Sequence, residues 1–310
     1  MYSMKTIIIS YVQLVVLVIC VMLAVAFFSL FERKILSYVH FRKGPNKVSI
    51  LGIMQPISDA MKLISKDDSP STWSNKFYYY ISPVFMMMIS LVSWWCFPMM
   101  WVNHSSFSSG LVVMMILGTT VYGILISGWS SNSKYSTIGG MRSVALSISY
   151  EVLLGFMFVA LLSFSCHYSM MLFHVFYFCK FVVLSPLIFI LFVLSSIAEL
   201  GRTPFDLAEG ESELVSGYSV EYGGICYTLI FLSENVMIVF SSFLISFLFI
   251  SSLCNIWGYI LFTFILLLMC LVRGILPRIR YDQVMIMCWI WFLPMMITLV
   301  NHLWLLKFIN

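Results

Sequence analysis

The sequence predicts an all-α integral membrane protein with about eight transmembrane helices, forming a single polytopic membrane domain over residues 1–310. Two observations predict this class. Of the 310 residues, 61% are hydrophobic and only 10% are charged, with a mean hydropathy of +1.00, so the chain lacks the polar surface of a water-soluble globule. Apolar runs of about 20 or more residues also recur along the whole chain, each long enough to cross about 30 Å of hydrocarbon.

The apolar runs are continuous rather than alternating. This favours helices over barrel strands, because a helix satisfies its own backbone hydrogen bonds in lipid. The first run far exceeds the about 7–15 apolar residues of a signal core, so we expect it to remain as the first membrane helix. The predicted spans are 6–31, 77–102, 107–129, 143–166, 175–198, 223–250, 254–272 and 284–306.

Basic residues fall on one side of this predicted topology. Lys and Arg occur in the segments after the first, third, fifth and seventh spans, and the segments after the second, fourth and sixth contain neither. By the positive-inside tendency, the basic segments face the cytoplasm or the mitochondrial matrix, and both termini lie on the opposite side. The predicted inner-side loops are 32–76, 130–142, 199–222 and 273–283.

The first inner-side loop contains an amphipathic pattern. Apolar residues recur at helical spacing between Ile50 and Ile64, while Gln55 and Asp59 lie with lysines on another face, which predicts a helix in the membrane interface between the first two spans. Pro56 is expected to bend this helix, because it removes a backbone donor. The helix could serve only as an anchor, but an acid among the lysines is not what binding to anionic lipid favours.

Three acidic residues fall within or directly after consecutive predicted spans: Glu151, Glu199 and Glu234. A charge at the bilayer centre costs roughly 2.5–3.5 kcal/mol, so such residues are kept mainly where they face a polar path. Burial also disfavours the charged form of a carboxyl group, which brings its proton exchange closer to neutral pH. Each acid alone could be a satisfied packing contact, but the three together favour a proton path.

The segment "GRTPFDLAEGESELVSG" concentrates further acids directly after the fifth span. Residues 199–221 hold seven charged side chains, whose insertion would cost roughly 20 kcal/mol on the same scale, so the segment is predicted to be a loop. Asp206 is placed to cap a short helix over 207–215. Apolar residues among the acids indicate that this loop folds against protein rather than lying in water.

Cysteine and histidine spacing argues against a metal site. The eight cysteines are scattered singly without any Cys-x-x-Cys pair, and the five histidines lack ligand spacing, whereas an iron–sulfur cluster or structural zinc needs clustered ligands. Neither a glycine-rich nucleotide fingerprint nor a P-loop is present. We therefore expect no metal, iron–sulfur cluster or flavin on this chain, and no nucleic-acid partner; membrane lipid is the expected surrounding.

Seven motifs carry a specific resemblance. "FERKILSY", "RKGPNKV", "QPISDAMKL", "GWSSNSKY", "SISYE", "RTPFDLAEGESELVSGYSVEY" and "RGILPRIRYDQVM" follow one another over nearly the whole chain. In this order they resemble the subunit 1 family of the proton-pumping NADH:ubiquinone oxidoreductase, respiratory complex I, in its mitochondrial form. The abundance of Met, Phe, Ile and Ser is similar to that of chains encoded in AT-rich mitochondrial genomes. The resemblance implies the mitochondrial inner membrane, with odd-numbered loops in the matrix and both termini in the intermembrane space.

The resemblance also implies a function and a set of site residues. A family member would be one subunit of an H⁺-translocating NADH:ubiquinone reductase, with membrane-arm and hydrophilic-arm subunits as partners, ubiquinone as substrate, and flavin and clusters on other chains. The ubiquinone chamber would then involve Glu32, Arg33, Gln55, Asp59, Arg202 and Phe205. An acidic proton relay from that chamber would involve Glu151, Glu199, Asp206, Glu209, Glu211 and Glu234.

Four positions depart from the family pattern: Leu146, Leu200, Gly201 and Asn235. Each is expected to remove a hydrogen-bonding group that could hydrate or orient the relay. Three other protein classes also fit part of the sequence. A free-standing cation or proton transporter would use intramembrane acids, although such folds often show inverted repeats and none is found here. A subunit of a membrane-bound hydrogenase would share the helix number, and a purely structural anchor would leave Glu151 and Glu234 unexplained.

Overall fold

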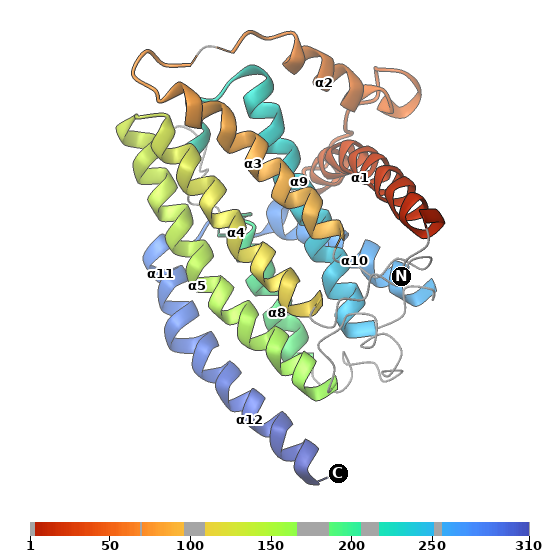
Figure 1. The fold of residues 1–310 in the computed structure, drawn as a ribbon, viewed down its shortest axis with the longest axis vertical. Helices are drawn as coiled ribbons and strands as arrows, with labels where there is room; N and C mark the ends of the chain where they lie inside the picture. The colour runs from red at the N-terminus through yellow and green to blue at the C-terminus, as the bar shows by residue number, and fades with distance from the viewer. Residues whose placement is uncertain are drawn as a thin grey trace.

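The structure is a computed structural model that describes residues 4–68, 70–95, 109–165, 186–205, 217–250 and 256–309. Every regular element in these ranges is helical, and Figure 1 shows their arrangement as a bundle. The α-helices are α1 (Met4–Val39), α2 (Gln55–Ile64), α3 (Lys76–Trp95), α4 (Ser109–Ser130), α5 (Lys134–Ser165), α8 (Pro186–Glu199), α9 (Gly224–Ile250), α10 (Ile256–Ile275), α11 (Tyr281–Ile286) and α12 (Leu293–Ile309). Short turns of 3₁₀-helix lie at Ile50–Gly52 (η1) and Gly217–Ser219 (η2), and a π-helical turn, Met287–Phe292 (η3), joins α11 to α12.

The predicted fold class is confirmed. Within the described residues, seven helices are long and apolar enough to cross a membrane: α1, α3, α4, α5, α9, α10 and the helix over Tyr281–His302. The predicted fifth span corresponds to α8, which is apolar but 14 residues long as described. Its predicted first residues, from 175, lie outside the described part of the chain.

Several helices extend beyond the predicted membrane spans. Helix α1 continues to Val39, past the predicted boundary at 31, and α5 begins at Lys134, so most of the predicted loop 130–142 is helical. Hydropathy marks the place where hydrocarbon ends rather than the place where a helix ends. Lys and Arg are good helix formers, so a helix continues through them into the interface.

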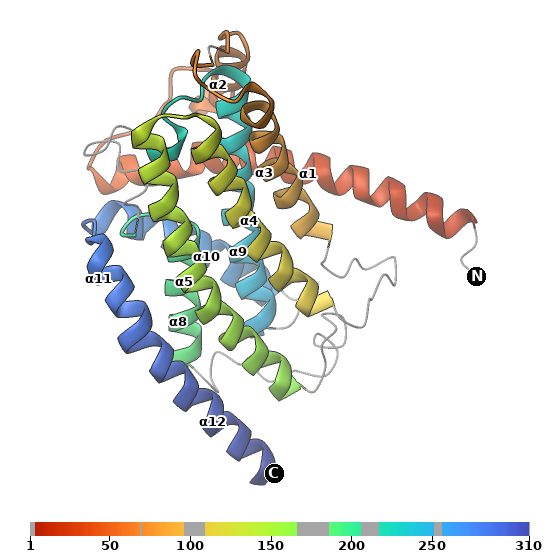
Figure 2. The same ribbon diagram turned by 60° about the vertical axis from the view of Figure 1, so that its left-hand side comes forward.

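The bundle core is formed around α9. This helix packs against α3, α8 and α10, while α5 packs against α4, α8 and α12. Two thirds of the most apolar stretch of α9 is buried (67%), compared with 22% for α1. Figure 2 shows the N-terminal half of α1 standing away from the other helices. Helix α9 is therefore the central element, and α1 has a long face outside the bundle.

Helix α2 lies across one end of the bundle, next to α1 and α9 (Figure 1). Its apolar residues, among them Ile57 and Met61, are exposed, as an interfacial helix requires. The predicted bend at Pro56 is wrong: the helix begins at Gln55, so the proline occupies the first turn. The missing N–H has no partner in a first turn in any case, and proline is favoured there.

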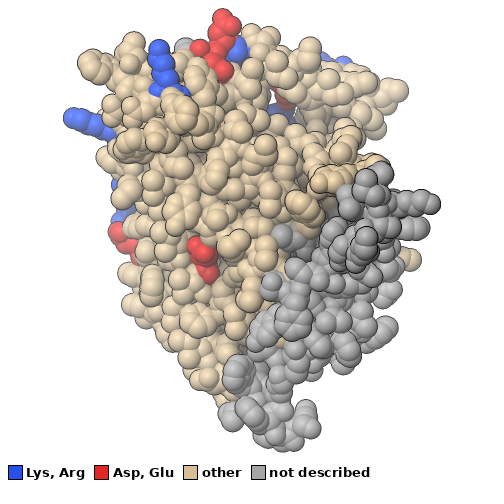
Figure 3. All heavy atoms as spheres, viewed as in Figure 1, with Lys and Arg blue, Asp and Glu red and all other residues tan. Residues whose placement is uncertain are grey.

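Charged side chains gather at the end of the molecule that holds α2. On the face drawn in Figure 3, Lys and Arg lie in the upper half of the view, whereas acidic side chains are also seen lower, near mid-height. Figure 2 shows α12 ending at the opposite end of the bundle from α2, whereas α1 runs out to one side. This arrangement fits one basic side, although the side of the membrane that each loop faces stays a prediction.

Candidate functional site

A cavity between α3, α4, α5, α8 and α9 contains two of the predicted relay acids, Glu199 and Glu234. Its space for the centres of water-sized molecules is about 100 Å³, several times the about 10–15 Å³ that one water needs. Polar side chains line it together with apolar ones, so water has hydrogen-bond partners there. The lining residues with hydroxyl or carboxyl groups are Thr120, Ser143, Ser147, Glu199, Tyr218, Ser233 and Glu234.

Glu234 has a direct hydrogen-bond partner in this cavity. The phenol of Tyr218 donates to Glu234 Oε1. Tyr218 lies in η2, outside the membrane helices, and its side chain is buried. Ser136 Oγ on α5 donates to the Tyr218 carbonyl at 3.0 Å, which fixes the backbone from which the tyrosine reaches the carboxylate.

The segment that carries Tyr218 is held to α3 and α4 by a second buried tyrosine. Tyr222 Oη lies 2.9 Å from both Ser82 Oγ and Ser130 Oγ, and its ring stacks on that of Tyr79 with centroids 4.3 Å apart. Burial raises the pKa of Tyr222 more than these hydroxyl contacts lower it. Tyr222 therefore remains a neutral phenol that anchors the segment.

Glu151 lies on α5 close to Glu199, near enough for their charges to repel. Its carboxylate packs against Gly118 of α4, where an added Cβ would lie 2.3 Å from Oε1. The neighbouring Tyr150 donates to the Val284 carbonyl at 3.1 Å and is buried, which holds α5 to α11 beside the acid. The close helix approach thus depends on a glycine facing Glu151.

The end of α8 determines where Glu199 and Arg202 lie. Gly201 adopts φ +60°, with the Gly201 N–H bonded to the Ala198 carbonyl and the Arg202 N–H bonded to the Ile197 carbonyl. These two bonds form a Schellman motif, which favours glycine at the left-handed position. Gly201 therefore does more than leave out a polar side chain: it ends α8 and turns the chain toward Arg202.

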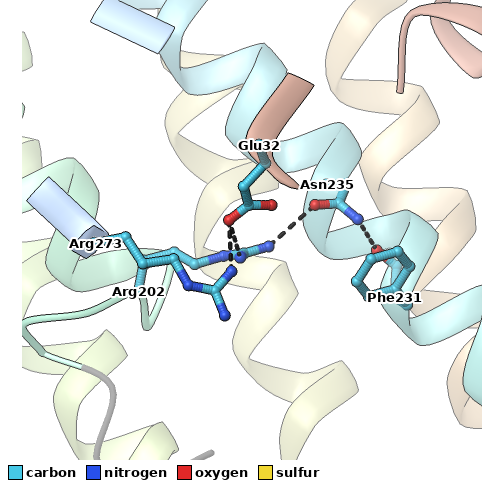
Figure 4. Close-up of polar contacts among 5 residues, drawn as sticks. All are labelled: Glu32, Arg202, Phe231, Asn235 and Arg273. Atoms are coloured by element: carbon cyan, nitrogen blue, oxygen red, sulfur yellow. Dashed lines mark hydrogen bonds and ion pairs between the residues drawn. The ribbon is translucent and has the colours of Figure 1, made fainter. Parts of the chain in front are cut away.

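Beyond this turn, Arg202 enters a partly buried ion cluster with the buried Glu32 of α1 and the exposed Arg273 of α10. Figure 4 shows Glu32 Oε1 accepting from both guanidinium groups, with the Arg202 contact at 3.2 Å. Arg202 Nη2 also donates to Asn235 Oδ1 at 3.0 Å. The expectation that Asn235 removes a hydrogen-bonding group concerns the acidic relay and stays a prediction; in this cluster the buried amide of Asn235 is a second acceptor for Arg202, beside Glu32.

A small cavity adjoins the ion cluster and is lined by Glu32, Arg202 and Arg273. Leu200, at the end of α8, lines both this cavity and the larger one that contains Glu199 and Glu234. An apolar side chain thus separates the cationic cluster from the acids. Leu146 also lines the acidic cavity, between the hydroxyl-bearing residues Ser143 and Ser147 of the same helix.

A second group of predicted chamber residues lies nearer the surface. Arg33 pairs with Asp59, and Gln55 Nε2 donates to the other Asp59 oxygen at 2.9 Å. These contacts join the end of α1 to α2. The adjacent residues Glu32 and Arg33 therefore point to different partners, one into the bundle and one toward the interfacial helix.

The structure divides the predicted site residues among these places. Phe205 lines the acidic cavity near Tyr150, with ring centroids 6.0 Å apart, rather than joining Arg33 and Asp59. Asp206, Glu209 and Glu211 lie outside the described residues. Sequence reasoning missed the roles of Arg273 and Tyr218. Both occur in the motifs "RGILPRIRYDQVM" and "SGYSVEY", but their partners are distant in sequence.

Comparison with known proteins decides the family. A family model described as NADH dehydrogenase matches residues 12–305. This chain belongs to the NADH dehydrogenase family. It is similar to the NADH-ubiquinone oxidoreductase chain 1 of Locusta migratoria, at 45% identity over 90% of both chains. It is also similar to the protein of that name from Aedes aegypti, at 43% identity over 92% of both chains, and from Apis mellifera ligustica, at 40% identity over 96% of this chain and 97% of the relative.

No group of three His, Cys, Asp or Glu side chains gathers as a metal site would within the described ranges. The absence of a metal, flavin or iron–sulfur cluster from the whole chain stays a prediction. Glu32 and Asp59 pair with arginine, Glu234 accepts from Tyr218, and Glu199 faces a cavity with room for water. This arrangement suits proton transfer and the stabilisation of negative charge.

Proposed function

We propose that this chain is a core membrane subunit of the proton-pumping NADH:ubiquinone oxidoreductase of the mitochondrial inner membrane. Its relatives at 40–45% identity are named NADH-ubiquinone oxidoreductase chain 1, and its described helices suit a membrane subunit. The partners are the other membrane-arm and hydrophilic-arm subunits of the complex, and ubiquinone is the substrate. In this role the chain helps to form the ubiquinone chamber and carries a proton relay.

The proposed relay rests on one observation: Glu199 and Glu234 line a single cavity with room for water, and Glu151 lies beside Glu199. Proton transfer needs donors and acceptors within about 2.6–3.2 Å of each other or joined through one water. Waters between the two cavity acids supply that connection. Glu151, Glu199 and Glu234 then form successive proton-holding groups across α5, α8 and α9.

The proposed contribution to the ubiquinone chamber comes from the cationic groups at the α2 end. Quinone reduction takes up two electrons and two protons, so negative charge develops on the quinone oxygens before protonation, and nearby cations lower the energy of that state. Arg33 is held by Asp59 of α2, and Arg202 and Arg273 are both held by Glu32 of α1. The electrons come from other subunits, and this chain binds and orients the substrate.

Co-migration tests the assignment to the complex. Membranes from the source are solubilised mildly and separated on a native gel, and this chain should migrate with inhibitor-sensitive NADH:ubiquinone reductase activity. Migration as a small particle without NADH activity would contradict the proposal and favour a free-standing transporter.

The relay is tested within the assembled complex. Glu151→Gln keeps the size of the side chain but cannot hold an exchangeable carboxyl proton. It should impair coupled quinone reduction and leave the amount of assembled complex unchanged. Normal turnover and normal pumping in the assembled Glu151→Gln complex would exclude this residue from the relay.

A further inference from the structure

The proton relay leaves one connection unexplained. Glu199 and Glu234 come from different helices and share a cavity, but within the described residues no hydrogen bond joins the two carboxylates. A water-sized gap between two acids conducts protons only where an ordered chain of donors and acceptors fills it. The side chain that already contacts one of the two acids is Tyr218.

Tyr218 has the geometry that such a chain requires. Tyr218 lines the cavity and its hydroxyl donates to Glu234 Oε1, another lining residue. A phenol oxygen that donates one hydrogen bond can also accept one, here from a cavity water. The ring is buried and its carbonyl is fixed by Ser136 at 3.0 Å. The hydroxyl is therefore held in place before any proton moves.

We infer that Tyr218 is a proton-transfer residue that passes protons between Glu199 and Glu234 through one cavity water. The inference rests on the proposed relay function. In the transfer, protonated Glu199 gives its proton to the water, the water gives one of its protons to the Tyr218 oxygen, and the Tyr218 O–H proton moves to Glu234 Oε1. The water and the phenol end unchanged, Glu199 ends as a carboxylate, and Glu234 ends protonated.

Concerted transfer avoids a charged tyrosine. The hydroxyl loses one proton while it gains another, so neither a phenolate nor a hydronium ion has to exist in the apolar surroundings, where an isolated charge is costly. A purely structural tyrosine at this position needs only its ring. Proton transfer needs the Tyr218 hydroxyl, which is hydrogen-bonded to the relay acid Glu234.

The test compares Tyr218→Phe with Tyr222→Phe in the assembled complex reconstituted into liposomes. Both substitutions remove one buried hydroxyl from the same segment, but the Tyr222 hydroxyl contacts Ser82 and Ser130 rather than an acid. Tyr218→Phe should lower proton pumping by about tenfold or more, the scale of losing a proton-transfer group. It should also raise the solvent deuterium isotope effect on pumping, because the relay step becomes rate-limiting. Tyr222→Phe should leave that isotope effect unchanged.

Tyr218→His gives a second variant that keeps a hydrogen-bond donor, and it should retain more pumping than Tyr218→Phe. Equal losses in Tyr218→Phe and Tyr222→Phe without a change in isotope effect would reduce Tyr218 to a structural role and overturn the inference. Unchanged pumping in assembled Tyr218→Phe would overturn it as well.

Comparison with Glu234→Gln separates this inference from the relay on which it rests. If Glu234→Gln alone leaves pumping intact, the relay itself fails. If Glu234→Gln abolishes pumping while Tyr218→Phe does not affect it, the relay stands and only the role of Tyr218 fails.

Discussion

Gly118→Ala tests the position of Glu151 without touching a titratable group. A Cβ at Gly118 would lie 2.3 Å from Glu151 Oε1, against an ordinary van der Waals separation of about 3.5 Å. The carboxylate oxygen must therefore retreat from α4 by about 1 Å, a displacement that can cost on the order of a hundredfold in a positioned reaction step. Helix α4 itself should not be weakened, since alanine is a better helix former than glycine by about 1 kcal/mol.

The expected result is a complex that assembles normally but pumps poorly. The assay reconstitutes the Gly118→Ala complex in liposomes and measures NADH:ubiquinone turnover and proton uptake per amount of assembled complex. Gly155→Ala is the matched control, because it adds the same methyl group one turn from Glu151, where the nearest side-chain atom, Met114 Cε, lies at 3.6 Å. Normal pumping by Gly118→Ala would refute the claim that the placement of the Glu151 carboxylate matters.

Two further predictions concern stability, measured as the midpoint of thermal dissociation of the purified complex. Gly201→Ala should destabilise the complex by about 1–2 kcal/mol, because alanine resists the left-handed φ of +60°. Gly223→Ala is the control and should have a small effect, because an added Cβ has no atom within 4 Å at either glycine. Equal midpoints for the two variants would contradict the Schellman assignment. Glu32→Gln should destabilise by about 1–3 kcal/mol, because it removes the buried carboxylate that pairs with both Arg202 and Arg273. Asp59→Asn, at the exposed pair with Arg33, should cost less than about 1 kcal/mol. A larger loss at Asp59 than at Glu32 would contradict this ranking.

The sequence predicts the membrane helices well because hydropathy is a local property. The ends of helices are harder to predict than their apolar centres: α1 continues to Val39, and α5 already begins at Lys134. Charged residues there mark the edge of hydrocarbon, while backbone hydrogen bonding carries the helix further. Pro56 illustrates the same limit, because its effect depends on whether the helix begins before or at the proline.

The candidate site is only partly predictable from the sequence. The acids Glu199 and Glu234 stand out because charge is rare in apolar spans, but their shared cavity depends on how α8 packs near α9. The pairing of Glu32 with Arg273 joins residues 241 positions apart, and no local pattern encodes it. The sequence does not single out Tyr218 either, because a tyrosine in a loop has no distinguishing local pattern. Its importance follows only from the hydrogen bond that its hydroxyl donates to Glu234.

The most direct test of the central claim is the number of protons pumped per ubiquinone reduced by a Glu234→Gln complex in sealed liposomes. Glu234 lines the cavity and accepts from Tyr218, so its carboxyl proton is the one that the relay must exchange. We expect the complex to assemble and coupled pumping to be lost. An assembled Glu234→Gln complex that pumps the normal number of protons per quinone would contradict this expectation.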